Sequence, residues 1–267
     1  MAREAAAEGV THIVCTPHAS EQFRYQKEAV EERFQELRDK LRGKIELSLG
    51  CEMYMTAENV FEAQANMPRY SFNDRGYLLI EFGTQYIPSH MFNALRLLQG
   101  AGYTLIIAHP ERYPAVTRRP ELLAKWMRSG CLVQVTAGSL YGRFGRTAEA
   151  FANELLSRDW IHFVATDAHD IKWRPPHLKK CYEYIARRAG EETARRLCFT
   201  NPQAAVEGAK WPEQPVAQGL MEHIPLNFST EEDSGSDRPP LLTSQRSKER
   251  EARQKSVWKR LFHEVRS

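Results

Sequence analysis

Side chains of the types that bind divalent metals gather at the ends of the predicted strands. They occur in Cys15-Thr16-Pro17-His18, Gly50-Cys51-Glu52, Leu79-Ile80-Glu81-Phe82, Ala108-His109-Pro110-Glu111-Arg112 and Thr166-Asp167-Ala168-His169. Five of the six predicted strands therefore finish in His, Glu or Asp, which are ligands for hard and borderline cations. Functional residues of parallel α/β folds lie just beyond the carboxyl ends of the strands, so we expect these side chains to share one site.

Such a cluster favours metal-assisted hydrolysis. Several carboxylates at one edge of a sheet repel each other unless cations lie among them. A carboxylate can bridge two metals, and a water shared by the two metals can ionise near neutral pH. Taken singly, His18 and His109 could be ordinary loop or core histidines, and Glu52 and Glu81 could be surface carboxylates. The coincidence at five strand ends is what favours a metal site.

Two arginines extend the predicted site toward phosphate chemistry. Arg112 follows His109 by three residues, and Arg174 follows His169 by five. Arginine is suited to bidentate contact with a phosphoryl group. The alternatives are an ion pair of Arg112 with Glu111 or another acid, and a structural contact of Arg174 with the following helix. We interpret Glu111 as a salt-bridge partner rather than a metal ligand.

The elements that must position these residues alternate between short apolar runs and amphipathic stretches. The predicted strands are 11–15, 45–51, 77–82, 104–108, 131–135 and 162–166, and the predicted helices are 27–41, 90–99, 120–128 and 147–157. Alternating strands and helices with apolar strands indicate a parallel α/β sheet, either open or closed as a barrel.

Composition excludes several classes of protein. The chain has 267 residues, of which 42% are hydrophobic, and 37 basic residues against 34 acidic ones give a net charge of +3. No apolar run approaches the roughly 18–20 residues that span a bilayer, and the first residues lack the apolar stretch of a signal peptide. The five cysteines are scattered without a C-x-x-C pair, which argues against a disulfide framework and a zinc ribbon. These features favour a cytoplasmic protein.

The composition changes after Trp211, which divides the chain into a catalytic domain at 1–211 and an appendage at 212–267. Residues 212–245 carry one base and six acids, and residues 246–267 carry eight bases and three acids, so their net charges are 1 − 6 = −5 and 8 − 3 = +5. The acidic part has the composition of a disordered linker, and the basic part has helical apolar spacing. That helix could contact a membrane surface weakly, bind a partner, pack on the domain or stay solvated. Nothing in it indicates nucleic-acid binding.

The motifs, in this order, resemble a known family. It is the metal-dependent protein-tyrosine phosphatases of the polymerase-and-histidinol-phosphatase (PHP) superfamily, in the bacterial branch linked to capsular and exopolysaccharide synthesis. The resemblance covers residues 2–210 and rests on six motifs, the five given above and Arg174-Pro175-Pro176-His177. It implies a distorted seven-stranded β/α barrel with three divalent ions, with manganese as our first choice and iron or zinc as alternatives.

The resemblance also implies a role for each residue. By this likeness Glu52 bridges two metals, Glu81 and His109 complete one of them, Asp167 belongs to another, His18 and His169 hold the third, and Arg112 and Arg174 grip the phosphate. Arg112, Arg174 and Asp167 are thus the residues predicted to act in catalysis. The implied substrate is the tyrosine-rich tail of a bacterial tyrosine kinase that governs polysaccharide export at the inner membrane, so the enzyme could be peripheral to that membrane.

The chain departs from the family pattern at its start. The family opens with a strand that carries a His-x-His pair, whereas this sequence begins with a stretch typical of a helix interior that leads directly into the 11–15 strand. Six strands are predicted and seven are expected. Either the start codon is assigned too far downstream or the protein is shortened and its metal site is incomplete. The filled ligand positions at the other strand ends favour the first explanation.

One cysteine motif points to a different chemistry. Cys181 and Arg187 fit the C-x5-R signature of cysteine-dependent tyrosine phosphatases. That mechanism needs a loop whose N–H groups surround the phosphate, but residues 179–188 have a helical pattern without glycine, and helix-interior N–H groups are already bonded. We therefore interpret Cys181 as a core residue.

The sequence thus predicts a metal-dependent phosphatase for phosphotyrosine in proteins. A metal-activated hydroxide would attack phosphorus while the metals and the two arginines neutralise the equatorial oxygens. Two alternatives are a PHP relative that hydrolyses a small phosphate such as histidinol phosphate, and a non-catalytic module that binds phosphotyrosine or a kinase. An oligomer is compatible with the sequence.

Overall fold

The computed structural model describes residues 1–83 and 86–221 of the chain. The predicted boundary at residue 211 lies within this part, while the basic amphipathic segment at 246–267 lies outside the described residues. Within the described ranges, no helix is both long enough and apolar enough to cross a bilayer.

All strand pairs in the described residues are parallel, as the alternation of strands and helices predicts. The strands are β1 (His12–Cys15), β2 (His18–Ala19), β3 (Glu46–Leu49), β4 (Glu52–Tyr54), β5 (Tyr77–Glu81), β6 (Thr104–Ala108), β7 (Leu132–Thr136) and β8 (Phe163–Ala165). They form a two-stranded sheet, β1-β3, and a six-stranded sheet in the order β2-β4-β5-β6-β7-β8. The predicted α/β class is therefore confirmed. The pairing of the described strands does not close into a ring, so the seven-stranded barrel stays a prediction.

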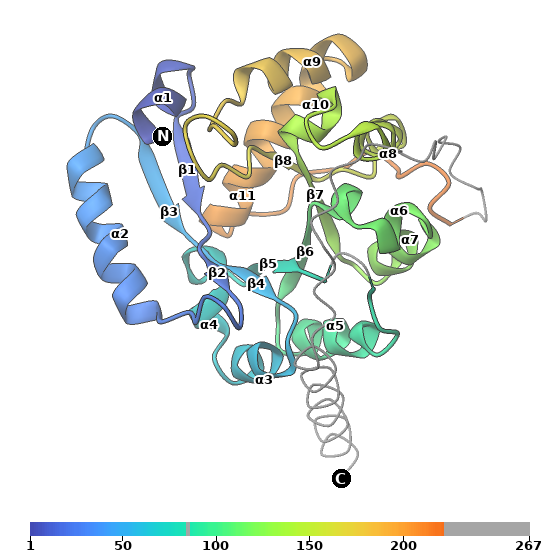
Figure 1. The fold of residues 1–267 in the computed structure, drawn as a ribbon, viewed down its shortest axis with the longest axis horizontal. Coiled ribbons are helices and arrows are strands. Elements are labelled where there is room, and N and C mark those ends of the chain that lie inside the picture. The colour runs from blue at the N-terminus through green and yellow to red at the C-terminus, as the bar shows by residue number, and fades with distance from the viewer. Residues whose placement is uncertain (84–85, 222–267) are drawn as a thin grey trace, which may run out of the picture.

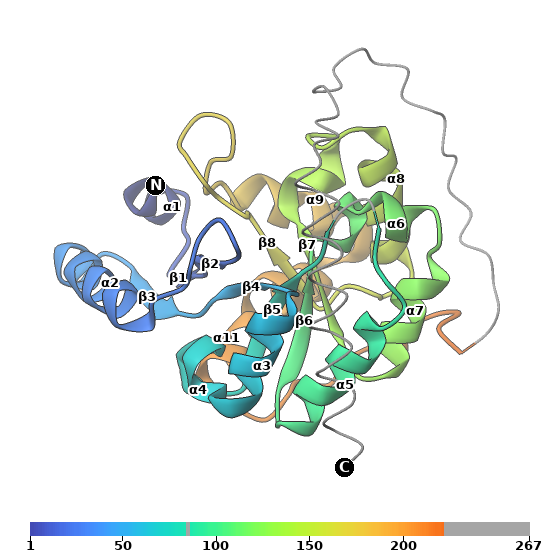
Figure 2. The ribbon, with the colours of Figure 1, turned by 60° about the horizontal axis from the view of Figure 1, so that its bottom comes forward.

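The helices lie around the outside of the strands (Figure 1; Figure 2 gives a second view). They are α1 (Ala2–Ala7), α2 (Lys27–Leu41), α3 (Ala57–Ala65), α4 (Met67–Tyr70), α5 (Met91–Gly100), α6 (Pro114–Thr117), α7 (Glu121–Arg128), α8 (Arg146–Ser157), α9 (Lys179–Ala189), α10 (Glu191–Arg195) and α11 (Asn201–Glu207). The prediction of 27–41 as a helix is confirmed at both ends, and the first residues are helical as their sequence indicates.

Two strands of the site, β2 and β4, were not predicted from the sequence. β2 has two residues and β4 has three, so neither is long enough to show a period of alternating side chains. The run predicted as one strand at 45–51 forms β3 only over Glu46–Leu49. A separate strand in the other sheet, β4, begins at Glu52 after Gly50 and Cys51. The chain thus changes sheets immediately before Glu52.

The central strands are apolar on both faces because side chains alternate between two cores. Leu78 and Ile80 of β5 belong to the core beneath the outer helices. Leu79, between them, belongs to a second core that includes Ile106, Phe163 and Val206. By the same alternation Glu81, two residues after Leu79, lies on the face of the second core. The sheet therefore carries its carboxylate on the face of the second core, to which α11 contributes Val206, and away from α3, α5 and α7.

Gly50 is needed for the passage from β3 to β4. A methyl group at this position would overlap the ring of Phe72, which is 6% exposed in the second core. We expect Gly50→Ala to lower the free energy of unfolding by about 1–3 kcal/mol, as overpacking does. Gly100→Ala, in open space at the end of α5, is the matched control and should not destabilise. Urea denaturation measures both; equal stability of the two variants would contradict the overlap.

Candidate metal centre

Strand register brings the first three predicted ligands together. His18 of β2 pairs with Glu52 of β4, and Tyr54, two residues on, pairs with Glu81 of β5. The Nδ1 atom of His18 lies 3.4 Å from Glu52 Oε2 and 3.7 Å from Glu81 Oε2. One ligand atom from each of these residues lies within 4.8 Å of the other two, a spacing that could hold a metal ion.

His109 reaches the same group from the end of β6. Its backbone is left-handed, with φ of 33° and ψ of 55°, and its side chain is 3% exposed. Its Nε2 atom lies 3.1 Å from Glu52 Oε1 and 3.6 Å from Glu81 Oε1. A left-handed residue other than glycine costs on the order of 1–3 kcal/mol, and such strain is concentrated at functional sites. The turn after β6 is thus held in a strained form that delivers the imidazole to both carboxylates.

The two carboxylates differ in their ionisation. Burial by itself raises the pKa of Glu52, but the hydrogen bond with His109 and the charges of His109 and His18 outweigh it and lower that pKa. Burial and the negative charge of Glu52 raise the pKa of Glu81 above 4.5. Burial also lowers the pKa of His109, but its hydrogen bond with Glu52 outweighs this effect and leaves the pKa above 6.5.

These four side chains fit a divalent cation. Two carboxylates and two imidazoles form the oxygen and nitrogen donor set that manganese, iron and zinc accept. The repulsion that raises the pKa of Glu81 is the interaction that a cation between the carboxylates would relieve.

The remaining predicted residues form a second group around Asp167. The guanidinium Nη1 of Arg112 donates to Asp167 Oδ2 at 2.6 Å, and Nη2 of Arg174 donates to the same oxygen. Asp167 is itself left-handed, with φ of 51°. The alternative of an ion pair between Arg112 and an acid other than Glu111 is therefore observed, with Asp167 as that acid. Arg174 contacts the same carboxylate.

His169 joins the two groups. Its ring centre lies 5.8 Å from that of His18, and its Nδ1 atom lies 3.0 Å from the carbonyl oxygen of Asp167. The structure therefore brings all eight predicted residues to one region. In it Asp167 contacts the two arginines, and His18 and His109 each contact both Glu52 and Glu81. The assignment of single metals to single residues stays a prediction.

Glu111 was misinterpreted from the sequence. We predicted a salt-bridge partner, but among the described residues it forms no ion pair and is 1% exposed. Its Oε1 atom accepts hydrogen bonds from the Thr136 N–H at 3.0 Å and from Ser139 Oγ at 2.7 Å. It thereby fastens the turn between His109 and Arg112 to β7. The only sign in the sequence that Glu111 supports the site was its position between His109, a predicted ligand, and Arg112, a predicted phosphate contact.

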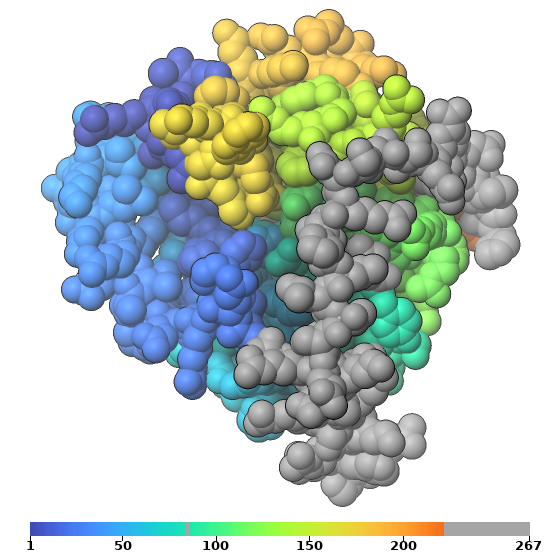
Figure 3. Space-filling model, in the orientation of Figure 1, coloured from blue at the N-terminus to red at the C-terminus, as the bar shows by residue number. Residues whose placement is uncertain are grey.

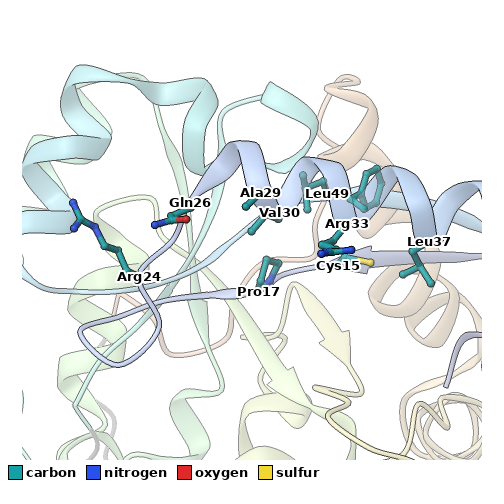
Figure 4. Close-up of a pocket in the computed structure, with 10 residues that line it drawn as sticks. Cys15, Pro17, Arg24, Gln26, Ala29, Val30, Arg33, Leu37 and Leu49 are labelled. Atoms are coloured by element: carbon teal, nitrogen blue, oxygen red, sulfur yellow. The ribbon is translucent and has the colours of Figure 1, made fainter.

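Other surfaces of the molecule do not involve these residues. A groove of about 480 Å³ beside α2 is lined by apolar residues such as Cys15, Val30 and Leu49, and none of the predicted site residues line it (Figure 4). Cys181 is fully buried in α9, and burial raises the pKa of its thiol. The interpretation of Cys181 as a core residue is therefore confirmed, and the C-x5-R match does not form a phosphate-binding loop.

Comparison with known proteins identifies the family. Residues 1–207 match the family model described as capsular polysaccharide synthesis, CpsB/CapC. The chain belongs to this family. The resemblance that the six motifs indicated is thereby confirmed.

Members of the family are similar to the chain over most of their length. The tyrosine-protein phosphatase YwqE of Bacillus subtilis is 35% identical over 196 residues, 72% of this chain and 77% of YwqE. The tyrosine-protein phosphatase CpsB of Streptococcus pneumoniae is 27% identical over 76% of this chain and 87% of CpsB. A crystal structure from work that describes YwqE and CpsB as unique metal-dependent tyrosine phosphatases superposes with a TM-score of 0.73 at 32% identity, covering 80% of this chain and 88% of that one.

Metal binding should depend on pH. His109 and Glu81 have pKa values above their ordinary 6.5 and 4.5, and each must lose its proton before it binds a cation. Affinity for Mn²⁺ is therefore expected to fall as the pH is lowered from about 8 to about 5, with proton release on binding. Calorimetric titration in two buffers of different ionisation enthalpy measures both; an affinity that is constant over this range would contradict the ligand assignment.

Glu111 should matter for stability. Glu111→Ala removes the acceptor of two buried donors, and we expect it to lower the free energy of unfolding by about 1–3 kcal/mol. Glu111→Gln keeps an acceptor oxygen and should cost less. Because Ser139 shares the interaction, the double variant Glu111→Ala, Ser139→Ala should cost less than the sum of its single variants. Additive losses in urea denaturation would show that the two residues act independently.

Proposed function

We propose that this chain is a metal-dependent phosphatase that hydrolyses phosphotyrosine in proteins. The observation that carries the proposal is the meeting of four cation ligands with two guanidinium groups. His18 and His109 each contact both Glu52 and Glu81, and Arg112 and Arg174 converge on Asp167. The activity of YwqE and CpsB supports the same reaction for this chain.

The carboxylates and imidazoles would bind the cation, and the arginines would bind the phosphoryl group. Glu52, Glu81, His18 and His109 would hold the cation, and we extend this to Asp167 and His169 for a cluster of up to three ions. A bound divalent cation supplies Lewis-acid polarisation of phosphoryl oxygen and activation of water. Glu52 stays ionised because its pKa is lowered, so it offers a charged ligand down to acidic pH.

Arg112 and Arg174 would bind the phosphoryl oxygens. Both guanidinium groups now donate to one oxygen of Asp167, so they point at a common position. A phosphate dianion near Asp167 would compete for the same donors and offers more acceptor oxygens than the carboxylate. Arg112 is further fixed by the ring of Phe144, whose centre lies 4.6 Å from the guanidinium carbon. The phenol that leaves has a pKa near 10, so it needs little help from a general acid.

The finer assignments are part of this proposal. We infer that the cation is Mn²⁺, that the strands complete a seven-stranded barrel of the PHP type, and that the catalytic domain covers 1–211. We infer further that the substrate is a bacterial tyrosine kinase of capsule or exopolysaccharide synthesis, which would place the enzyme at the inner face of the membrane. The match to a capsular polysaccharide family supports this partner.

The assigned site is tested by Glu52→Gln. This change removes the central charge of the cluster while keeping its size, and we expect phosphotyrosyl-peptide hydrolysis with Mn²⁺ to fall by about 10²-fold or more. Glu46→Gln, whose side chain is 84% exposed at the start of β3, is the matched control and should keep full activity. Circular dichroism checks that both variants are folded.

The same assay separates the alternatives. Hydrolysis of histidinol phosphate in preference to the phosphotyrosyl peptide would identify a small-molecule phosphatase instead. Binding of the peptide without turnover at any Mn²⁺ concentration would identify a non-catalytic module. Activity retained in Glu52→Gln would show that the assigned site is wrong.

A further inference from the structure

Large apolar side chains are exposed on the loops that surround the metal centre. Phe23, on the loop after β2, is 55% exposed. Tyr86 is 64% exposed after β5, while Ile171 and Trp173 are 54% and 82% exposed after β8. These loops follow β2, β5 and β8; His18 and Glu81 lie on the first two strands, and Asp167 and His169 lie just after the third. Exposed apolar groups that gather around one site indicate a binding surface.

Phe23 is held in place by its own turn. The Ser20 N–H donates to the Phe23 carbonyl at 2.9 Å, and the Phe23 N–H donates to Ser20 Oγ at 3.1 Å. Its ring is stacked against that of His18, with centroids 6.2 Å apart and planes 23° from parallel. The exposed ring thus stands next to a predicted metal ligand.

Trp173 is presented by an equally constrained loop. The Asp170 carboxylate oxygen Oδ1 accepts from the backbone N–H groups of Lys172 at 2.6 Å and Trp173 at 2.5 Å. The Trp173 carbonyl in turn accepts from Arg143 Nη1 at 2.9 Å. The next residue, Arg174, reaches Asp167. The indole is therefore adjacent in the chain to one of the two predicted phosphate contacts.

The two loops are neighbours in space. The ring contact between His18 and His169 links the strand before one loop to the start of the other. In Figures 1 and 3 the loop after β8, in yellow, and the loop after β2, in blue, lie next to each other on the face turned to the viewer. The loops that carry the exposed rings therefore lie side by side next to the polar groups of the site.

We propose that Phe23 and Trp173 form an aromatic collar that binds the phenyl ring of the substrate and thereby selects aryl phosphates over alkyl phosphates. The proposal rests on the phosphotyrosine activity proposed above and assigns the residues that recognise its substrate. A tyrosine phosphate places a flat apolar ring directly behind the phosphoryl group, where aromatic side chains can stack on it. A phosphoserine or glycerol phosphate has no such ring, and the arginines and cation would bind its phosphoryl group alone.

Binding of two phosphonates that cannot be hydrolysed tests the collar. Phenylphosphonate and butylphosphonate share the headgroup and differ in the ring, so calorimetry with the full chain loaded with Mn²⁺ measures the contribution of the ring. The wild type is expected to bind phenylphosphonate more tightly. Phe23→Ala and Trp173→Ala should each weaken phenylphosphonate about three- to tenfold and leave butylphosphonate within about twofold.

Phe199→Ala is the matched control. Phe199 is 41% exposed and lines a cavity with His12 and Glu46, which begin β1 and β3, so it lies near the ends of the strands opposite to the site. This variant should change neither affinity. Wild-type affinities in Phe199→Ala would show that removing an exposed phenylalanine elsewhere does not weaken the binding of phenylphosphonate.

The outcomes separate the collar from the proposed activity. Equal affinity of the wild type for both phosphonates, or equal loss for both in Phe23→Ala and Trp173→Ala, would overturn the collar. Loss of Mn²⁺ affinity in Phe23→Ala with an unchanged preference for the phenyl ring would also overturn it, because Phe23 would then only support His18. A preserved ring preference in a protein that hydrolyses no phosphotyrosyl peptide would support the collar and refute the proposed function.

Discussion

The buried carboxylate of Glu52 is the constraint on which the rest of the site depends. It is 4% exposed, and it contacts His18 on one oxygen and His109 on the other. Its charge is kept by these imidazoles against the cost of burial, and in turn it raises the pKa of Glu81. A second, partly buried carboxylate so near would destabilise the fold unless positive groups were held around both. The placement of His18, His109 and the arginines follows from that requirement.

The scaffold meets the requirement with short strands and strained turns. Parallel register sets His18 opposite Glu52 and sets Glu81 on the same face two residues beyond Leu79. His109 and Asp167, which follow β6 and β8, have left-handed backbones that turn their side chains back toward the centre. The fold stabilises these turns elsewhere, for example through the buried hydrogen bonds of Glu111 to β7. The apolar cores on both faces of β5 and β6 provide the rigidity that such strain demands.

The loops that leave the site combine rigid backbones with exposed rings. Asp170 and Ser20 satisfy the N–H groups of their own loops, so the backbone of each loop is fixed while the side chains of Phe23 and Trp173 stay accessible. Polar groups thus lie at the strand ends and apolar ones at the rim. This arrangement suits a substrate that is an anion at one end and an aromatic ring behind it, as phosphotyrosine is.

The sequence by itself determined the α/β class, the helix at 27–41 and the set of residues that could bind a cation, because these depend on periodicity and residue type. It could not show that the chain leaves one sheet after Leu49 and joins another at Glu52, since β2 and β4 are too short for any periodic signal. Nor could it show that Glu111 is buried or that both arginines meet on Asp167, because those facts depend on how distant strands pack. Only the tertiary structure decided which charges face one another, because the contacts of His109, Glu52 and Glu81 join residues that are far apart along the chain.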